Sequence, residues 1–445
     1  MKKTIYLLLL SILLPACEVL NLEPESKISD RQAITDASSL ETAVYGMYAR
    51  LHNNDYYGLT FQSVGYLPGD NVKWTGSYDF LSQFDANNVR ADNTQLPPVF
   101  TGIYRTVNCA NQVISASYSL ADPQLSASNR KLYRGEAYFV RALSYFDLSR
   151  LWGGVQLITE PTLSSLDNKG IRRSSLQETR LQVLTDLDSA EVLLPETTNR
   201  NRATRKTVFA LKARLYLYMN DWNKAELYAS KLISDSNYEL IAPYSSFFAN
   251  NVKNTKESIL ELAYSATDQN SHSQWWQPPV NSGRREWAPT DELVNLLNDP
   301  LTGGNRKTMI ARTAAPGNLW YGNMYYRNPR TDPAFVLRIA EMYLIRAEAR
   351  AQLSKIPEGL MDLNAVRARA GLVPAAASTI EELLLATEQE RRLEFAFEPH
   401  RWFDLVRTVR LDDVLGVTDR TKWVMPIPVT EIQASEGIIE QNEGY

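Results

Sequence analysis

Hydrophobic residues recur at helical spacing along most of this chain, and the helices that they predict come in pairs. The pattern over 40–51 has its partner at 99–117, and the pattern over 134–152 has its partner at 176–194. Apolar residues cover nearly every face of 134–152, which predicts a helix buried between others. These four segments therefore predict two packed helix pairs.

The segment 207–233 carries the most informative pair. Small Ala213 lies on its first helix, a polar turn follows, and apolar residues recur at helical spacing on its second helix. Small residues at fixed positions let two helices cross closely, and this arrangement is the tetratricopeptide pattern. A fourth pair spans 337–353 and 358–372, where Gly371 is placed as a C-terminal cap. The expected fold is mainly α, with about four tetratricopeptide-like helix pairs.

Two long segments interrupt the helical pattern, at 52–95 and at about 235–337. They are rich in Gly, Pro, Asn and aromatic residues. Loops longer than about 15 residues without structure of their own are uncommon in compact domains and are usually functional. Five of the nine tryptophans lie in these insertions, and we expect them to be displayed rather than packed in the helical core: Trp74, Trp275, Trp276, Trp287 and Trp320.

The N-terminus predicts export. Two lysines precede an apolar run over about 5–14, and small residues follow, which is the layout of a secretory signal. The run is too short to span a bilayer as a helix. It ends in LPAC, which resembles a bacterial lipobox, where cleavage precedes a cysteine that carries diacylglycerol. Cys17 is thus the expected lipidation site, and ordinary cleavage near Ala16 is the alternative.

Removal of a signal over 1–16 leaves a polar tether over 17–30 and one domain over 31–445. The loss of two lysines takes the formal net charge from −4 to −6. A mildly acidic chain gives no case for nucleic acid as a partner. Hydrophobic residues make up 44% of the chain and charged residues 22%, as expected for a folded globular protein. With Cys17 acylated, Cys109 is expected to be a buried small apolar residue.

No catalytic or metal-binding pattern stands out in the sequence. The three histidines, His52, His272 and His400, are far apart. The chain has no H-E-x-x-H, no G-x-S-x-G, no Walker A loop and no G-x-G-x-x-G. Carboxylates are abundant, but nothing local marks a glycosidase pair. We therefore expect no enzyme activity and no cofactor, and no metal site is predicted.

The stretch ERRLEFAFEPHRWFDL at 390–405 places charged residues among large apolar ones. It predicts a helix that runs to Pro399 and a second short helix after it. Buried charges must be paired, and the planar arginine fork suits carboxylates. Glu348 or Arg369 is the expected partner from the preceding repeat. We interpret the stretch as a structural ion network, rather than a catalytic site or a partner contact, formed by Glu390, Arg391, Glu394, Arg401 and Asp404.

These features together resemble the SusD/RagB family of outer-membrane nutrient-binding lipoproteins, over nearly all of the mature chain. The resemblance implies a helical fold with four tetratricopeptide-like units, in an N-terminal half over about 31–240 and a C-terminal half over about 255–445. It also implies a surface-exposed lipoprotein that captures a nutrient, typically an oligosaccharide, and delivers it to a SusC-like TonB-dependent transporter. The segments that carry it, in order, are RGEAYFVRALSYFDLSRLWGGVQLITEP, APTDELVNLLND, VLRIAEMYLIRAEARAQ, LNAVRARAGL, ERRLEFAFEPHRWFDLVR and VMPIPVTEIQASEGIIEQNEGY.

Three loops carry residues suited to sugars, at 65–80, 271–287 and 317–326. Flat aromatic side chains can cover the apolar faces of sugar rings, and Asp, Asn and Arg can bond the hydroxyl groups. A peptide- or glycopeptide-binding protein of the same kind would instead favour charged clefts, and a periplasmic tetratricopeptide assembly adaptor would be shielded from outside the cell. The expected carbohydrate-binding residues are Trp74, Tyr78, Asp70, Asn71, Trp275, Trp276, Arg284, Trp320 and Tyr321.

Overall fold

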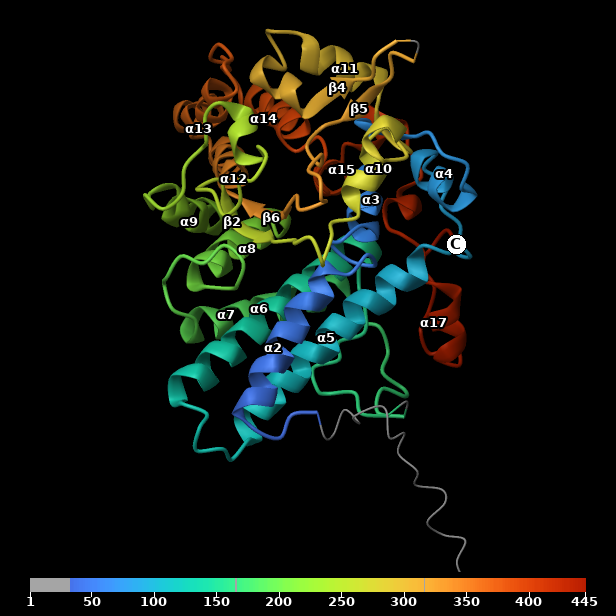
Figure 1. Cartoon of the computed structure of the whole chain (residues 1–445), viewed down its shortest axis with the longest axis vertical. Coiled ribbons are helices and arrows are strands. Elements are labelled where there is room, and N and C mark those ends of the chain that lie inside the picture. The colour runs from blue at the N-terminus through green and yellow to red at the C-terminus, as the bar shows by residue number, and fades with distance from the viewer. Residues whose placement is uncertain (1–32, 165, 316) are drawn as a thin grey trace, which may run out of the picture.

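Helices form the bulk of the computed structural model, which describes residues 33–445 except Ser165 and Pro316 (Figure 1). The predicted signal over 1–16, Cys17 and the tether over 17–30 lie outside the described residues. The long helices are α2 (Ala37–His52), α5 (Leu96–Ser119), α6 (Ala127–Trp152), α7 (Leu176–Leu193), α8 (Arg205–Tyr218), α9 (Trp222–Ile233), α12 (Ile339–Gln352), α13 (Ile356–Arg369) and α14 (Ile380–Glu394).

The four predicted helix pairs are confirmed. Helix α2 packs against α5, α6 against α7, α8 against α9, and α12 against α13. Contacts of α7 with α8 and of α9 with α12 then join successive pairs into one stack. Helix α6 is buried on nearly every side from Gly135 to Trp152, as its apolar sequence predicts. Gly371 adopts a φ of +75° just after α13, which is the left-handed conformation of a C-terminal cap.

The two insertions are less irregular than their composition suggests. They contain short strands that pair in three two-stranded antiparallel sheets. They also contain the short helices α3 (Thr60–Tyr66), α4 (Asp79–Asp85), α10 (His272–Trp276) and α11 (Asp291–Asn298), with 3-10 turns at Tyr244–Phe247, Pro279–Asn281 and Gly304–Met309. The strand pairs are β1 (Val72–Trp74) with β3 (Trp287–Pro289), β2 (Ser258–Leu262) with β6 (Ala334–Arg338), and β4 (Ile310–Arg312) with β5 (Trp320–Gly322).

Helix α14 ends earlier than predicted, at Glu394 rather than at Pro399. The carbonyl groups of a last helical turn have no partner within the helix. Here the Tyr244 hydroxyl and Arg338 Nη2 both donate to the Glu394 carbonyl oxygen at 3.1 Å. Side chains from other elements thus satisfy the helix end, and the chain turns before Pro399 is reached. The predicted second helix is confirmed as α15, Arg401–Arg407.

The C-terminal segment returns to the N-terminal half of the fold. The backbone N–H of Met425 donates to Leu151 O at 2.7 Å, and Trp152 Nε1 donates to Pro426 O at 2.9 Å. These bonds fasten the end of the chain along α6. The elements of this segment are α16 (Leu411–Leu415), a 3-10 turn at Arg420–Trp423 and α17 (Val429–Ala434).

A close contact fixes the short helix α3 against the corner between α14 and α15. A Cβ atom on Gly65 would lie 2.5 Å from Pro399 Cβ and 2.9 Å from its Cα. Nearby, the rings of Phe61 and Phe403 stack with centroids 6.2 Å apart. The N-terminal insertion is therefore held directly by the C-terminal corner, and Gly65 has no room for a side chain.

Gly65→Ala tests this contact, and Gly46→Ala in α2 is its matched control, because a Cβ on Gly46 would meet nothing within 4 Å. Alanine favours a helix by about 0.5–1 kcal/mol over glycine, so we expect Gly46→Ala to raise the free energy of unfolding. We expect Gly65→Ala to lower it by about 1–3 kcal/mol, because overpacking forces the backbone to shift. Denaturant titration measures both, and equal gains in the two variants would contradict the contact.

Candidate functional site

The two insertions meet at β1 and β3, whose register sets Trp74 opposite Trp287. Thr75 extends this pairing. Its backbone N–H donates to Glu286 O at 2.8 Å, and its hydroxyl donates to Arg285 O at 2.7 Å, across a sequence separation of 210 residues. The loops predicted to carry the site are thus joined by backbone pairing rather than held apart.

An aromatic platform, defined as Trp74, Tyr78, Phe80, Trp275 and Trp287, covers this junction. Trp275 stacks on Trp287 with ring centroids 5.2 Å apart, and Trp74 lies 6.1 Å from Trp275. Tyr78 stacks between Trp74 at 6.2 Å and Phe80 at 5.1 Å. Trp287 is buried, whereas Tyr78 is 39% exposed. The platform therefore has a rigid floor and an open edge, as a surface for ring stacking requires.

Arg284 lies at the open edge of the platform. Its guanidinium carbon is 5.4 Å from the Tyr78 ring centroid and 4.8 Å from that of Trp275. Glu286 Oε1 accepts from Arg284 Nε at 2.8 Å, which compensates the charge. A guanidinium laid on aromatic faces is attracted by their electrons and keeps its rim of N–H groups accessible. The structure thus brings three of the predicted residues, Tyr78, Trp275 and Arg284, together at the exposed edge of the platform.

Trp320 and Tyr321 lie on β5, beside β3. Arg285 Nε donates to Trp320 O at 2.8 Å, and the guanidinium of Arg312 lies 5.5 Å from the Trp320 ring. Both aromatic rings are half-buried. Trp320 and Tyr321 are connected to the platform segment through a hydrogen bond to the Trp320 backbone. Among the described residues, neither ring contacts a ring of the platform. Their role in ligand binding stays a prediction.

Asp70 and Asn71 are occupied by contacts within the protein, which corrects their expected display. Asp70 accepts from Arg401 Nε at 2.7 Å and pairs with Arg392 at 3.2 Å. Burial raises the pKa of Asp70, but these two arginines outweigh it and lower that pKa. Asn71 is fully buried, donates to Arg392 O at 2.9 Å and accepts from Arg392 Nε at 3.0 Å. Because both residues directly precede β1, they position Trp74 rather than face solvent.

Trp276 and Trp287 are also buried, although their loop composition predicted display. Trp276 packs against Trp287 with centroids 5.7 Å apart and against Phe397 at 4.7 Å. A Cβ on Gly322 would lie 2.6 Å from Trp276 Cε3, so the strand that carries Trp320 rests on this ring. Trp276 therefore forms the support beneath the site.

A polar pocket beside α10 was not identified from the sequence. Its volume is about 560 Å³, and its lining includes Ser273 of α10, Gln277 directly after α10 and the segment 326–330. The only sequence signal is the run NMYYRNPR at 323–330, which mixes polar and aromatic residues with a proline and has neither helical nor strand periodicity. Such a run predicts a loop, but it does not say that the loop closes over a cavity.

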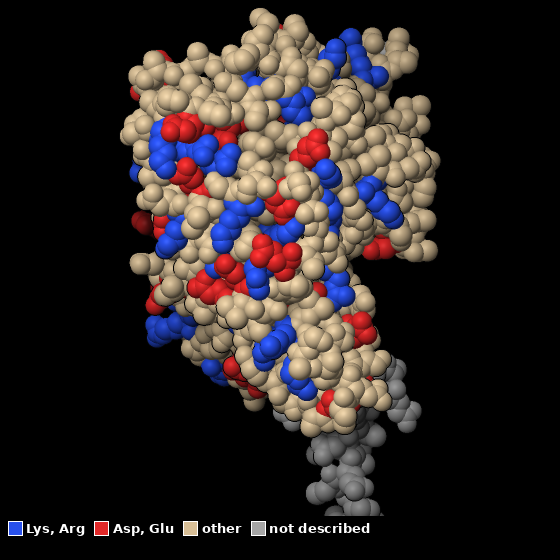
Figure 2. Space-filling model, turned by 90° about the vertical axis from the view of Figure 1, so that its left-hand side faces the viewer, with Lys and Arg blue, Asp and Glu red and all other residues tan. Residues whose placement is uncertain are grey.

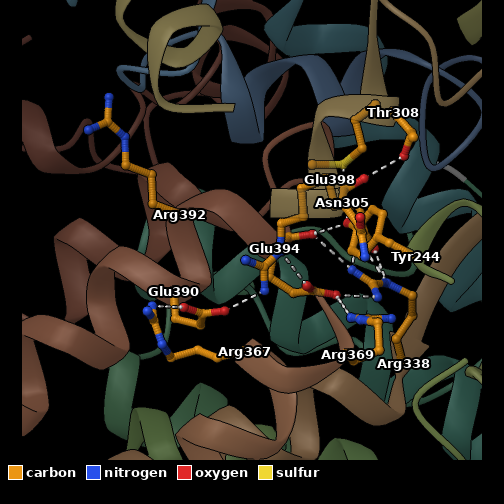
Figure 3. A network of polar contacts seen from close by, with 12 residues as sticks. Tyr244, Asn305, Thr308, Arg338, Arg367, Arg369, Glu390, Arg392, Glu394 and Glu398 are labelled. Atoms are coloured by element: carbon orange, nitrogen blue, oxygen red, sulfur yellow. Dashed lines mark hydrogen bonds and ion pairs between the residues drawn. The ribbon is translucent and has the colours of Figure 1, made fainter. Parts of the chain in front are cut away.

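Glu394 is the centre of a buried ion network (Figure 3). Its Oε2 accepts from Arg306 Nε at 2.9 Å, its Oε1 accepts from Arg338 Nη1 at 2.9 Å, and Arg369 is its third partner. Arg338 also pairs with Glu398 at 2.6 Å. Burial raises the pKa of Glu394, but the three arginines outweigh it and lower that pKa to about 2. The carboxylate is therefore charged at neutral pH although it is fully buried.

Two more glutamates complete this network. Glu390 pairs with Arg306 and with Arg367, the latter at 3.1 Å, and Glu257, the residue directly before β2, pairs with Arg338 at 2.9 Å. Together, four arginines and four glutamates compensate one another. Such compensation is what allows charges to remain buried.

The other residues of the expected network form two neighbouring chains of ion pairs. Asp404 pairs with Arg391 and with Arg407, both at 2.8 Å, and Arg407 Nη2 donates to Glu348 at 2.8 Å. Arg401 pairs with Asp70, as described above. All five predicted residues thus make ion pairs, and Glu348 and Arg369 take part as expected. These arginines are paired with carboxylates inside the fold, so the arrangement offers a brace rather than a reaction centre.

The side of the molecule seen in Figure 2 shows no patch of one charge sign. Figure 2 shows acidic and basic side chains interspersed over the side that carries α7, α9 and α13. Nor does any group of three or more His, Cys, Asp or Glu within the described residues suit a metal ion. The platform and its polar pocket are therefore the features that most resemble a ligand site.

Comparison with known sequences gives two family matches. A family described as "Starch-binding associating with outer membrane" matches residues 18–217, and one described as "SusD family" matches residues 321–417. A SusD-like protein, P38, of Formosa agariphila is 26% identical, with 94% of each chain covered. A SusD-like protein of Bacteroides ovatus is 25% identical over 90% of this chain and 81% of its own.

Solved structures show the same fold. A SusD superfamily protein of Bacteroides vulgatus superposes with a TM-score of 0.80 at 24% identity, over 93% of this chain and 100% of its own. A structure described as a laminarin-binding SusD-like protein gives a TM-score of 0.80 at 22% identity, with the same coverage. The helical stack and its insertions are thus a known arrangement.

His272 offers a test of how α10 is held beneath the platform. It is fully buried, between Trp287 at 5.9 Å and Tyr325 at 4.8 Å, and burial lowers its pKa from 6.5 to about 3. The unfolded chain therefore binds a proton between these pH values that the folded chain does not. Stability from this residue is fully present above pH 6.5 and is lost as the pH falls towards 3.

We expect the free energy of unfolding to fall less steeply in His272→Phe than in the unchanged protein. Between pH 6.5 and pH 4.5 the difference amounts to about 2.3 kcal/mol, because the slope reaches about 1.36 kcal/mol per pH unit only below the pKa of the unfolded His. Urea titrations at several pH values measure it. His400, whose pKa burial also lowers, is present in both proteins, so the difference reports His272 alone. Parallel pH profiles would show that His272 is not held neutral in the fold.

Proposed function

Because this chain belongs to the SusD/RagB family, we propose that it binds an oligosaccharide at the cell surface and passes it to a SusC-like TonB-dependent transporter of the outer membrane. The observation that carries the proposal is the aromatic platform, with an exposed Tyr78 backed by stacked tryptophans and bordered by Arg284. A neighbour in fold described as laminarin-binding supports a sugar as the ligand.

The platform is suited to capture rather than to chemistry. A sugar ring laid on Tyr78 and Trp275 buries its apolar face, while Arg284 donates hydrogen bonds to its hydroxyl groups. Trp74 and Trp287 keep the stacking surface in place from beneath. Trp320 and Tyr321 extend it along β5, where a longer oligosaccharide reaches them. Binding and release without bond cleavage is the activity that this proposal assigns to the protein.

Attachment to the outer membrane by a lipid on Cys17 is the second part of the proposal. Its support is the lipobox-like sequence and the family description, which refers to association with the outer membrane. None of the helices in the described part of the chain combines the length and the apolar character that spanning a bilayer requires. Acyl chains on one cysteine would hold the protein at the membrane surface, since each buried CH₂ contributes about 0.8 kcal/mol.

We further propose that residues 31–445 act as one domain. The support is the ion network, in which Asp70 of the N-terminal half pairs with Arg401 of the C-terminal half at 2.7 Å. The close contact of Gly65 with Pro399 crosses the same boundary. In a single domain, the surface that captures the ligand and the surface that faces the transporter would move as one body.

Tyr78→Ala tests the platform, and Tyr118→Ala is its matched control. Both tyrosines are exposed, at 39% and 64%, and each has an arginine over its ring, but Tyr118 lies on α5, away from the insertions. Loss of one stacking ring is worth about 0.5–1.5 kcal/mol, so we expect Tyr78→Ala to weaken oligosaccharide binding about two- to tenfold. A glycan array first identifies the oligosaccharide that binds most strongly. Calorimetry with that oligosaccharide then measures the change in affinity.

Tyr118→Ala is expected to bind like the unchanged protein, and both variants are expected to keep the melting temperature. Unchanged glycan binding in Tyr78→Ala would remove the platform from the proposal. Binding of peptides in place of glycans would favour the peptide-binding alternative instead.

Cys17→Ala tests the anchor. We expect the variant to leave the membrane fraction and to lose incorporation of a radiolabelled fatty acid, because the thiol that carries the lipid is absent. Cys109→Ala is the control, since it removes the other cysteine and is expected to keep both properties. External protease on intact cells should digest the unchanged protein. A protected protein would instead point to a periplasmic adaptor.

A further inference from the structure

The polar pocket lies on the opposite side of α10 from the platform. Ser273 of α10 and Gln277, the residue that directly follows α10, both line the pocket, and Ser273 and Trp275 are two residues apart in the helix and so lie on different faces of it. Trp275 faces the platform, where it stacks on Trp287. One short helix therefore separates the two surfaces, and a single oligosaccharide can contact both.

The pocket holds hydrogen-bonding groups that the protein does not use. Ser273 is 4% exposed, and its hydroxyl has no partner among the described residues. The side chains of Asn323, Tyr326 and Asn328 likewise make no hydrogen bond within residues 33–445. By contrast, Gln277 Nε2 is committed to two backbone carbonyl oxygens, each at 3.0 Å. Buried polar groups are normally paired, so the unpartnered Ser273 hydroxyl, with the partly exposed Asn323 and Tyr326 and the exposed Asn328 beside it, indicates a site for a polar ligand.

The charge of the pocket is positive. None of the described residues that line it is acidic, and two are arginines, Arg327 and Arg330. Arg327 is compensated by the buried Asp332, 3.5 Å from its Nε. Arg330 has no carboxylate within ion-pairing distance in the described part of the chain. It contacts only neutral oxygens, Gln274 Oε1 at 3.2 Å and Ser282 O at 3.4 Å. One guanidinium is therefore left without a counter-ion at a cavity wall.

We propose that this pocket binds an acidic sugar residue, which presents a uronate carboxylate or a sulfate ester to Arg330. The planar fork of arginine donates two parallel hydrogen bonds to either oxyanion. Asn323, Tyr326 and Asn328 then bond the ring hydroxyl groups, and the neighbouring sugar of the same chain reaches the platform around α10. The proposal rests on oligosaccharide capture and names the class of glycan that is captured.

The experiment begins with an array of neutral, carboxylated and sulfated oligosaccharides. The strongest acidic ligand is then compared by calorimetry with its neutralised form, the methyl ester of a uronate or the desulfated form of a sulfated glycan. We expect the acidic form to bind at least about tenfold more tightly, as hydrogen bonds to charged groups predict. Whether a uronate or a sulfated glycan gives the stronger signal identifies the acidic group.

Arg330→Gln is expected to abolish that preference, because it weakens binding of the acidic form far more than binding of the neutralised form. Arg172→Gln is the matched control, because Arg172 is exposed, forms no ion pair in the described residues and lies between α6 and α7. It is expected to keep the preference. The unchanged protein gives a second measurement that needs no variant, since added salt should weaken binding of the acidic form more than that of the neutral form.

The outcomes separate the two proposals. Tight binding of neutral glycans, weakened by Tyr78→Ala but unaffected by Arg330→Gln and by salt, would overturn the acidic-sugar inference and leave oligosaccharide capture standing. An equal loss of preference in Arg330→Gln and Arg172→Gln would also overturn it. Absence of binding to every oligosaccharide on the array would overturn oligosaccharide capture and the inference with it.

Discussion

The burial of many charges at one corner is the constraint on which the rest of the structure depends. Glu394 is fully buried, yet it stays ionised because three arginines surround it. Removal of one partner from such a buried pair costs about 3–5 kcal/mol, since the remaining charge has no compensation. The partners come from β6, α13, α14, the turn at Gly304–Met309, Glu257 just before β2 and Glu398 between α14 and α15, so these segments must dock in one arrangement. The network therefore specifies how these segments pack against one another as well as contributing to stability.

Two residues connect that geometry to the aromatic platform. Asp70 and Asn71 are held by Arg401 and Arg392, and β1 begins at the very next residue. The ion pairs of Arg401 and Arg392 therefore fix where β1 begins. The register of β1 with β3 then places Trp74 opposite Trp287. The sequence stretch that looks most like an active site therefore acts by fixing the strand on which the platform is built.

The sequence was sufficient to predict the helix pairs, because each long helix repeats its apolar face many times over. It was also sufficient for the ion pairs, since charges flanked by Phe and Trp cannot be buried alone. It did not predict three-residue strands such as β1, because their partners lie far away in the chain and no local period marks them. Nor could composition separate Trp275, at the surface, from Trp276 beneath it. Only the neighbours supplied by the fold distinguish the two.

The pairing of Trp74 with Trp287 has a consequence for how such proteins change their ligands. Each half of the platform is contributed by a different insertion, and the two insertions share a strand register. Grafting one insertion from a relative would set its strand against a partner that evolved with another sequence. If the platform binds the ligand as proposed, new specificity would arise from side-chain replacements on the existing strands or from the joint inheritance of both insertions as a matched set.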